Sequence, residues 1–311
     1  MIKQNFTLRD IEQITGIQSA TLRMWKKRYG ILQPRKVQAK KLYYDVDDLK
    51  YLLNIKILTD HGYRISQVLE MDIDEVHDKI HSLTLQRSNA YDGQLSNELL
   101  TAIIDLNESN LEHAYFRSIE IFGFKNAMKK ILLPLLVHLG DLWMTDAIHV
   151  LQEHFYSHFL RQKLMMATDI LPPVSGESSV LMFLPELELH DISLLFLNYL
   201  FRDAGTKTLY LGQSVPYSDL RMILANQGID AAVFNIIYTG NLDLHQGMMP
   251  KIISAFPDVR FIMTASGATR GSFSKLAQKK KLNNLELYDN MDEIENKVLP
   301  ELSKSHSNTL T

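Results

Sequence analysis

The chain contains no cysteine in its 311 residues, so disulfide bonds and thiolate metal sites are excluded. Long apolar runs are also lacking, because no segment approaches the roughly 18 apolar residues that a membrane-spanning helix needs. The N-terminus shows no signal-peptide pattern, and there are no internal repeats or low-complexity tracts. We therefore expect a cytoplasmic protein that does not enter a membrane.

Apolar residues, by contrast, make up 46% of the chain. This length and apolar content predict two or three domains with cores of their own. Basic residues concentrate at one end: residues 1–64 hold 13 lysines and arginines against 6 acidic residues, and the rest of the chain holds 20 against 30. A surface for nucleic acid is therefore expected only in the first 64 residues.

The densest basic stretch spans residues 21–36. It has six lysines and arginines and no acidic residue, with Trp25 and Tyr29 interleaved, a composition that suits contact with phosphate groups. The apolar spacing of residues 8–14 predicts a short amphipathic helix before it, and Gly16 separates the two. A helix, a tight turn and a basic helix together predict a helix-turn-helix whose second helix enters the major groove.

A basic hairpin, or wing, is predicted next, because Pro34 excludes helix and residues 42–44 are typical of a strand. Here the chain resembles the MerR-type winged helix-turn-helix regulators. The matching residues are, in order, Thr15-Gly16-Ile17, Thr21-Leu22-Arg23, Trp25, Arg28-Tyr29-Gly30, Pro34-Arg35 and Leu42-Tyr43. The form Trp-x-x-Arg-Tyr-Gly is similar to the branch of that family with a cobalamin-binding C-terminal half, which includes light-responsive repressors.

The resemblance implies DNA contacts from the second helix and the wing. The residues are Ser19, Thr21, Arg23, Trp25, Lys26, Arg28, Tyr29, Arg35, Lys36, Lys40, Lys41 and Tyr43. Ala39, Lys40 and Lys41 depart from the usual wing pattern but keep its positive charge. Because such regulators read two half-sites, we expect a dimer or tetramer on a palindromic operator in double-stranded DNA.

Hydrophobic periodicity divides the chain into domains of the multidomain α and α/β class. Residues 1–86 are the predicted winged helix-turn-helix, residues 95–171 a four-helix bundle after a polar linker at 88–94, and residues 178–302 an α/β domain. Pro134 is expected to kink the third helix of the bundle. Residues 303–311 are expected to be a disordered tail.

The α/β domain is predicted to hold a doubly wound, five-stranded parallel sheet of the flavodoxin or Rossmann type. Short apolar runs that alternate with helical stretches give the strands Val180–Phe183, Thr208–Leu211, Ala231–Ile237, Arg260–Thr264 and Leu285–Tyr288. Sheets of this type bind ligands at the carboxyl ends of their strands, so the loops there are the places to look for a site.

His190 follows the first of these strands and is the leading candidate for a ligand site. Glu188 or Asp191 could orient its ring, as carboxylates do for metal-binding histidines. Glu188 and His190 also resemble the motif of cobalamin-binding domains, in which the histidine is the lower axial ligand of cobalt. The resemblance implies cobalamin, as adenosylcobalamin or methylcobalamin, with His190 on the metal.

Further cofactor contacts are implied by the same resemblance. They are Ser193, Ser214, Ser266 and Gly267. Ser193 and Ser266 stand where the family has glycines that let the cofactor tail approach the backbone. Extra atoms at these positions could weaken or abolish binding.

Trp143, Glu153 and His154 resemble the signature that covers the upper ligand of the cofactor in cobalamin-dependent MerR regulators. Phe155 stands where that signature has a second histidine. Trp143 is expected to end the third helix of the bundle, and Glu153 to lie about two turns into the fourth. His154 and His158 could instead bind a metal ion, although no third ligand is evident.

Three functions remain open from the sequence. The leading one is a DNA-binding transcriptional regulator, a repressor and not an enzyme, whose oligomerisation is controlled by a cobalamin-type ligand. In the second, the sensor half binds no cofactor and responds to a protein partner, such as RNA polymerase or a regulatory protein. In the third, the α/β domain carries cobalamin for methyl transfer, but no substrate-activating domain accompanies it.

Overall fold

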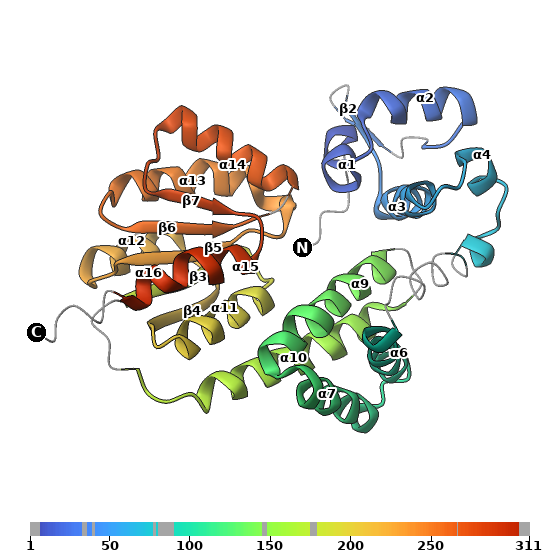
Figure 1. The fold of residues 1–311 in the computed structure, drawn as a ribbon. Coiled ribbons are helices and arrows are strands. Elements are labelled where there is room, and N and C mark those ends of the chain that lie inside the picture. The colour runs from blue at the N-terminus through green and yellow to red at the C-terminus, as the bar shows by residue number, and fades with distance from the viewer. Residues whose placement is uncertain are drawn as a thin grey trace, which may run out of the picture. The chain divides into compact units, whose positions relative to one another are not determined.

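The computed structural model describes residues 7–32, 36–38, 41–76, 79, 90–144, 148–174, 179–265 and 267–304 (Figure 1). The chain divides into two compact units, an N-terminal unit, Met1–Leu160, and a C-terminal unit, Arg161–Thr311. Helices and a hairpin build the N-terminal unit, and a five-stranded sheet lies in the C-terminal unit. Within the described part of the chain, no helix is both long and apolar enough to cross a membrane.

The predicted winged helix-turn-helix begins the N-terminal unit. Its helices are α1, Leu8–Thr15, and α2, Ser19–Tyr29, and Gly16 makes the turn between them with a φ of +71°. Strands β1, Lys36–Gln38, and β2, Lys41–Tyr43, pair antiparallel as the wing. Helices α3, Val46–Asp60, and α4, Ile65–Val68, follow. They share one apolar core with α1 and α2, so the unit can hold α2 at a fixed angle.

Four helical segments follow, as predicted. They are α6, Ala90–Ile104; α7, Glu108–Phe122; a run of α8, Phe124–Ala127, η1, Met128–Leu132, and α9, Leu133–Met144; and α10, Val150–Asp169. η1 is a π-helical turn directly before Pro134, whose ring and missing N–H disturb the regular hydrogen-bond ladder. The buried hydroxyl of Tyr156 donates to the carbonyl of Leu132 at 2.9 Å, which ties α10 to this turn.

Three helix boundaries differ from the sequence-based expectation. α6 begins at Ala90, so most of the expected linker at 88–94 is helical. α10 begins at Val150, because the Gln152 side chain accepts a hydrogen bond from the His149 N–H at 3.0 Å and fixes the start there. Glu153 therefore lies in the first turn and not two turns in. α16, Leu299–Lys304, includes residues 303 and 304 of the expected tail, and residues 305–311 lie outside the described part.

All five predicted strands form one parallel sheet in the C-terminal unit. They are β3, Ser179–Pro185; β4, Lys207–Val215; β5, Ala231–Asn235; β6, Arg260–Thr264; and β7, Leu285–Tyr288. The order β4-β3-β5-β6-β7 is that of flavodoxin-like sheets, which confirms the predicted fold class. Every residue of β3 after the first is buried, as expected for a parallel strand covered on both faces.

Helices cover both faces of this sheet. On the face with Phe183 and Phe234 lie α12, Tyr217–Asn226; α13, Leu242–Ala255; and α14, Gly267–Lys280. α11, Ile192–Asp203, packs on the opposite face against β3, β4 and β5 (Figure 1). α15, Met291–Glu293, and η3, Ile294–Val298, lead into α16. β4 and β5 flank β3 on its two sides, so the loops after β3 and β5 meet at the topological switch point, where such sheets bind ligands.

Candidate ligand site and nucleic-acid surface

One buried carboxylate, that of Glu188, joins the loop after β3 to the loop after β5. Its Oε1 accepts hydrogen bonds from the N–H groups of Leu189 and His190, at 3.0 and 3.1 Å. Its Oε2 accepts hydrogen bonds from the N–H groups of Ile237 and Tyr238, both at 2.8 Å. Because Glu188 is 0% exposed, these bonds hold its charge without help from solvent.

The hydrogen bonds also keep Glu188 ionised. Burial by itself raises the pKa of this carboxyl, but the hydrogen bonds from His190 and Tyr238 and the attraction to the His190 ring outweigh it, so the pKa falls to about 2. Glu188 is therefore a carboxylate throughout the physiological pH range.

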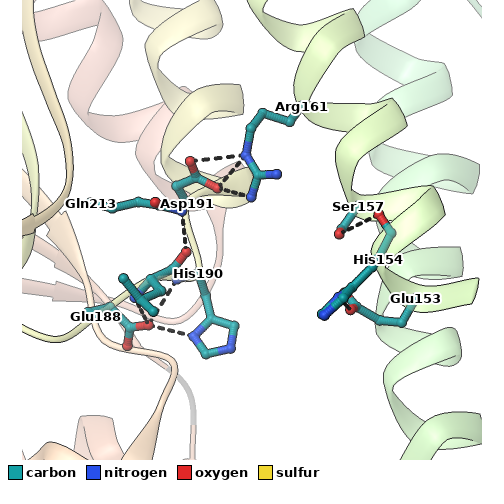
Figure 2. Close-up of polar contacts among 9 residues, drawn as sticks. Glu153, His154, Ser157, Arg161, Glu188, His190, Asp191 and Gln213 are labelled. Carbon is teal, nitrogen blue, oxygen red and sulfur yellow. Dashed lines mark hydrogen bonds and ion pairs between the residues drawn. The ribbon is translucent and has the colours of Figure 1, made fainter. Parts of the chain in front are cut away.

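The carboxylate holds the ring of His190 (Figure 2). Nδ1 of His190 lies 2.5 Å from Oε1 of Glu188, while the histidine side chain is still 55% exposed. An ionised carboxylate can only accept, so Nδ1 carries a proton, and the lone pair of Nε2 is available whenever the ring carries no second proton. The Tyr238 ring lies near it, with 6.2 Å between the centroids. A histidine oriented in this way is suited to bind a metal through Nε2.

Apolar side chains lie in the same two loops as this histidine. Leu187 and Leu189 precede it in the loop after β3, and Ile237 comes from the loop after β5; all three side chains are more than half exposed. Large apolar side chains exposed beside an imidazole nitrogen suit a ligand that has both a broad apolar surface and a metal centre.

The second carboxylate beside His190, that of Asp191, does not bind the ring. It binds Arg161 of α10, whose Nη2 donates to Oδ1 at 2.8 Å and whose Nε lies 3.2 and 3.3 Å from the two oxygens (Figure 2). The Asp191 side chain is 7% exposed and that of Arg161 is 24% exposed. Of the two carboxylates that the sequence left open, Glu188 therefore orients the ring.

Two of the three serines predicted for the cofactor site, Ser193 and Ser214, have partners within the protein. The Ser193 hydroxyl, in the first turn of α11, accepts a hydrogen bond from the side-chain amide of Asn235. The Ser214 hydroxyl accepts one from the N–H of Leu187 at 3.0 Å and so holds the loop after β3 to the end of β4. Gly267 begins α14, and Ser266 lies outside the described residues.

Sequence reasoning missed four residues that build this site. Ile237 and Tyr238 act through backbone N–H groups, which nearly every residue has, so no side chain marks them. Arg161 lies 30 residues before its partner and carries no motif. Asn235 did have a signal, because it is the one polar residue in the apolar strand β5.

The other predicted cofactor residues lie in the N-terminal unit. Trp143 is half-buried near the end of α9. In the first turn of α10, Oε2 of Glu153 lies 2.7 Å from Nδ1 of the exposed His154. The rings of His154 and His158 are 6.4 Å apart, and no group of three or more possible ligands for a metal ion occurs among the described residues. Among the residues that the structure describes, these two histidines therefore have no third ligand for a free metal ion.

α2 exposes most of its basic side chains and buries two of its apolar ones, Leu22 and Trp25. Arg23, Lys27 and Arg28 are exposed, whereas Leu22 and Trp25 belong to the core. Trp25 is only 9% exposed, so its indole ring packs in the core and offers little surface to a partner. The exposed side chains on this helix are those that a DNA backbone would meet first.

The remaining residues predicted to contact DNA are spread over α2 and the wing. Partly exposed on α2 are Ser19, Thr21, Lys26 and Tyr29. The Ser19 hydroxyl donates to Glu12 of α1, which fixes one helix to the other. Lys36 lies on β1, and Lys41 and Tyr43 lie on β2. Arg35 and Lys40 lie outside the described residues.

Two family models match the chain. The model described as MerR HTH family regulatory protein matches residues 6–72, which contain α1, α2 and the wing strands. The model described as B12 binding domain matches residues 95–167, which contain α7, α9 and most of α6 and α10.

Relatives match over a longer part of the chain. The HTH-type transcriptional repressor CarH of Myxococcus xanthus is 26% identical over 231 residues, which are 72% of this chain and 77% of that protein. CarA, an HTH-type transcriptional repressor of the same organism, is 24% identical over 218 residues, 69% of this chain and 70% of that protein. Among solved structures, the Methanosarcina barkeri monomethylamine corrinoid protein shares the fold, with a TM-score of 0.54 and 14% identity over 67% of this chain and 96% of that one. The chain thus combines a MerR HTH domain with a B12-binding domain and is homologous to the CarH and CarA transcriptional repressors.

Proposed function

We propose that the protein is a DNA-binding transcriptional repressor whose C-terminal half senses a cobalamin. The observation that carries the proposal is the Glu188–His190 pair at the switch point of the sheet, in a chain that begins with a winged helix-turn-helix. Homology to two proteins named as transcriptional repressors supports the direction of control. Such a protein would act on DNA in the cytoplasm, without turnover of a substrate.

The residues at the site fit a cobalamin. His190 would supply Nε2 as a ligand of the cobalt, and Glu188 would keep Nδ1 protonated and the ring in place. Leu187, Leu189 and Ile237 would offer apolar surface to the macrocycle. Bound adenosylcobalamin or methylcobalamin would supply a cobalt–carbon bond whose breakage can serve as a signal.

Contacts to the remaining parts of the cofactor are assigned to the residues predicted for them. Trp143, Glu153 and His154 would cover its upper ligand, as in the regulators that this chain resembles. Ser214 is the last residue but one of β4 and Gly267 begins α14, so both belong to the carboxyl ends of the strands, where the tail would enter.

The DNA-binding end would work through α2 and the wing. Arg23, Lys27 and Arg28 would neutralise phosphates beside the major groove, and the basic wing would follow the neighbouring backbone. Recognition of two half-sites requires two copies of the unit, so the active form would be a dimer or tetramer whose assembly depends on the ligand.

The proposal is tested with purified protein and adenosylcobalamin in the dark. Gel filtration with full absorption spectra gives the cobalamin bound per chain and the oligomer size, and fluorescence anisotropy with DNA selected from a random pool gives the affinity. We expect cobalamin to co-elute with the wild type and with His113→Ala, which removes an exposed histidine of α7, but not with His190→Ala. Colourless wild-type protein of unchanged size would refute cobalamin sensing.

A second candidate, a regulator whose sensor half binds no cofactor and answers to a protein partner, is favoured by one observation. The Ser193 hydroxyl, at the position where the cobalamin-binding motif that this chain resembles has glycine, is already bonded to Asn235 beside the predicted tail site. A methyl-transfer role has only the fold similarity to a corrinoid protein in its favour. Transfer of the methyl group from bound methylcobalamin to a thiol, at equal rate in wild type and Arg23→Ala, would favour that role over repression.

A further inference from the structure

His190 lies between two buried carboxylates that are fixed by different parts of the C-terminal unit. Glu188 is held by backbone N–H groups of the loops after β3 and β5. Asp191 is held by the guanidinium of Arg161, which belongs to α10. The histidine loop is therefore anchored on both sides of its ligand residue, once to the sheet and once to a helix (Figure 2).

Asp191 occupies a position in which an aspartate usually serves its own helix. It is the N-cap residue of α11, and aspartates there normally accept a hydrogen bond from an N–H of the first turn. Among the described residues Asp191 makes no such side-chain bond, although its carbonyl accepts one from the N–H of Leu195 at 2.8 Å. Its two oxygens are turned to Arg161 instead. The Asp191 carboxylate thus binds Arg161 and not the N–H groups of α11. This choice of partner is expected of a residue that fixes the position of the loop and not of one that stabilises α11.

The charges of the pair depend on each other. Both side chains are largely withdrawn from solvent, so each would leave an uncompensated charge behind if its partner were removed. Tyr210 of β4 lies close by, and burial, followed by the charge of Asp191, raises its pKa well above the usual range. The Tyr210 hydroxyl therefore stays neutral and cannot neutralise the positive charge of Arg161. The negative charge that does so is that of Asp191.

We propose that the Arg161–Asp191 ion pair is the positioning element of the His190 loop: it ties the residue after His190 to α10, so that Nε2 is in place before a ligand arrives. The identity of that ligand rests on the proposed function, whereas the positioning is a property of the ligand-free chain. Two measurements can therefore separate the two claims.

The first measurement is hydrogen–deuterium exchange on the ligand-free full chain. The variants are Arg161→Gln, Arg161→Lys and, as matched control, Arg260→Gln. The Arg260 side chain is 27% exposed and makes a comparable guanidinium–carboxylate pair with Glu286. Arg260 is the first residue of β6, so it lies at the amino ends of the strands, whereas His190 lies at their carboxyl ends. Circular dichroism melts establish that each variant is folded.

We expect the backbone N–H groups of Leu189 and His190 to exchange about tenfold faster in Arg161→Gln, and less so in Arg161→Lys, which keeps the charge without the forked contact. Arg260→Gln should leave this loop at the wild-type rate. Equal exchange of the loop in Arg161→Gln and wild type would overturn the proposal, as would equal acceleration by Arg260→Gln, since the effect would then be one of general stability.

The second measurement uses cob(II)alamin and protein whose histidines carry nitrogen-15. Electron paramagnetic resonance shows whether the hyperfine splitting from the nitrogen ligand changes with the label, and therefore whether a histidine of the protein is the ligand; loss of the label-dependent splitting in His190→Ala assigns it to His190. We expect the label-dependent signal in wild type and Arg260→Gln, and its loss or broadening in Arg161→Gln. If the wild type gave no such signal, the proposed function would fail, while the exchange result would still decide on the ion pair. Full label-dependent ligation in Arg161→Gln would overturn the positioning role.

Discussion

The side-chain amide of Asn235 donates a hydrogen bond to the hydroxyl of Ser193, so the end of β5 is fastened to the first turn of α11. The other polar atom of this amide, Oδ1, is buried and has no hydrogen-bond partner within the described residues. A buried acceptor left in this state is costly unless water or a ligand meets it. The Ser193–Asn235 contact therefore uses the amide donor only, and we expect the Ser193 hydroxyl to limit the space for a ligand beside it.

Replacement of Ser193 by glycine should show this directly. The variant loses one hydrogen bond and gains backbone freedom in α11, so we expect it to be less stable by about 1 kcal/mol and to bind cobalamin more tightly than the wild type. Spectral titration and urea unfolding measure the two effects. Ser218→Gly is the matched control, because Ser218 is also the second residue of its helix but is exposed. Unchanged affinity in Ser193→Gly would mean that the hydroxyl does not limit the space.

Glu188→Gln should change the pH dependence of stability. The folded pKa of Glu188, about 2, lies below its ordinary value of 4.5, so its contribution is fully present above pH 4.5 and is lost as the pH falls toward 2. This difference corresponds to about 3 kcal/mol at neutral pH. The gap in unfolding free energy between wild type and variant should therefore shrink between pH 7 and pH 3, as followed by circular dichroism in urea. Glu186→Gln removes a carboxylate from the same loop and is the matched control.

Arg23→Ala should weaken DNA binding without regard to sequence if the side chain meets a phosphate. Removal of one phosphate interaction should lower the slope of log affinity against log salt by about 1. Anisotropy titrations at several salt concentrations, with operator and unrelated DNA, give both quantities. Arg221→Ala removes an exposed arginine of α12 and should leave the slope unaltered. A decrease in affinity confined to operator DNA would instead indicate that Arg23 reads a base.

Substitutions of Trp25 test whether this residue supports DNA binding indirectly, by packing α2 against the core, or directly, by contact with DNA. Because the side chain is almost fully buried, Trp25→Ala should destabilise the winged unit by about 3–5 kcal/mol and abolish DNA binding with it. Trp25→Phe keeps an aromatic ring in the core and should keep most of the affinity. If Trp25→Phe folded as stably as the wild type and yet failed to bind DNA, a direct contact by the indole would be required.

The architecture of the C-terminal unit was readable from the sequence because fully buried parallel strands leave uninterrupted apolar runs, as in β3 and β5. β4 was predicted too short, at residues 208–211. Its last part includes Gly212, Gln213 and Ser214, which are poor strand formers, and tertiary contacts hold them in place: the Gln213 amide donates to the Leu189 carbonyl at 2.6 Å.

The sequence predicted the residues of the candidate site that act through their side chains, but not those that act through the backbone. His190 and Glu188 stand two residues apart, so the sequence shows them together as a motif. The N–H groups of Ile237 and Tyr238 bind Glu188 from 49 and 50 residues away, and no sequence pattern marks them. The start of α10 depends on the side chain of Gln152 folding back on His149, a local contact that apolar periodicity does not register. Long-range backbone contacts and caps of this kind follow from the fold and not from the spacing of residue types.

The anchoring of Glu188 and Asp191 has a kinetic meaning for any ligand that His190 takes. A loop that must be ordered on binding lowers affinity through its decrease in entropy and slows capture. In this protein the His190 loop is ordered before a ligand binds. Backbone N–H groups of the loop after β5 hold Glu188, and Arg161 holds Asp191. The residence time of the ligand would then be set by the strength of the bond to Nε2, and the protein would report the presence of its ligand for as long as that bond lasts.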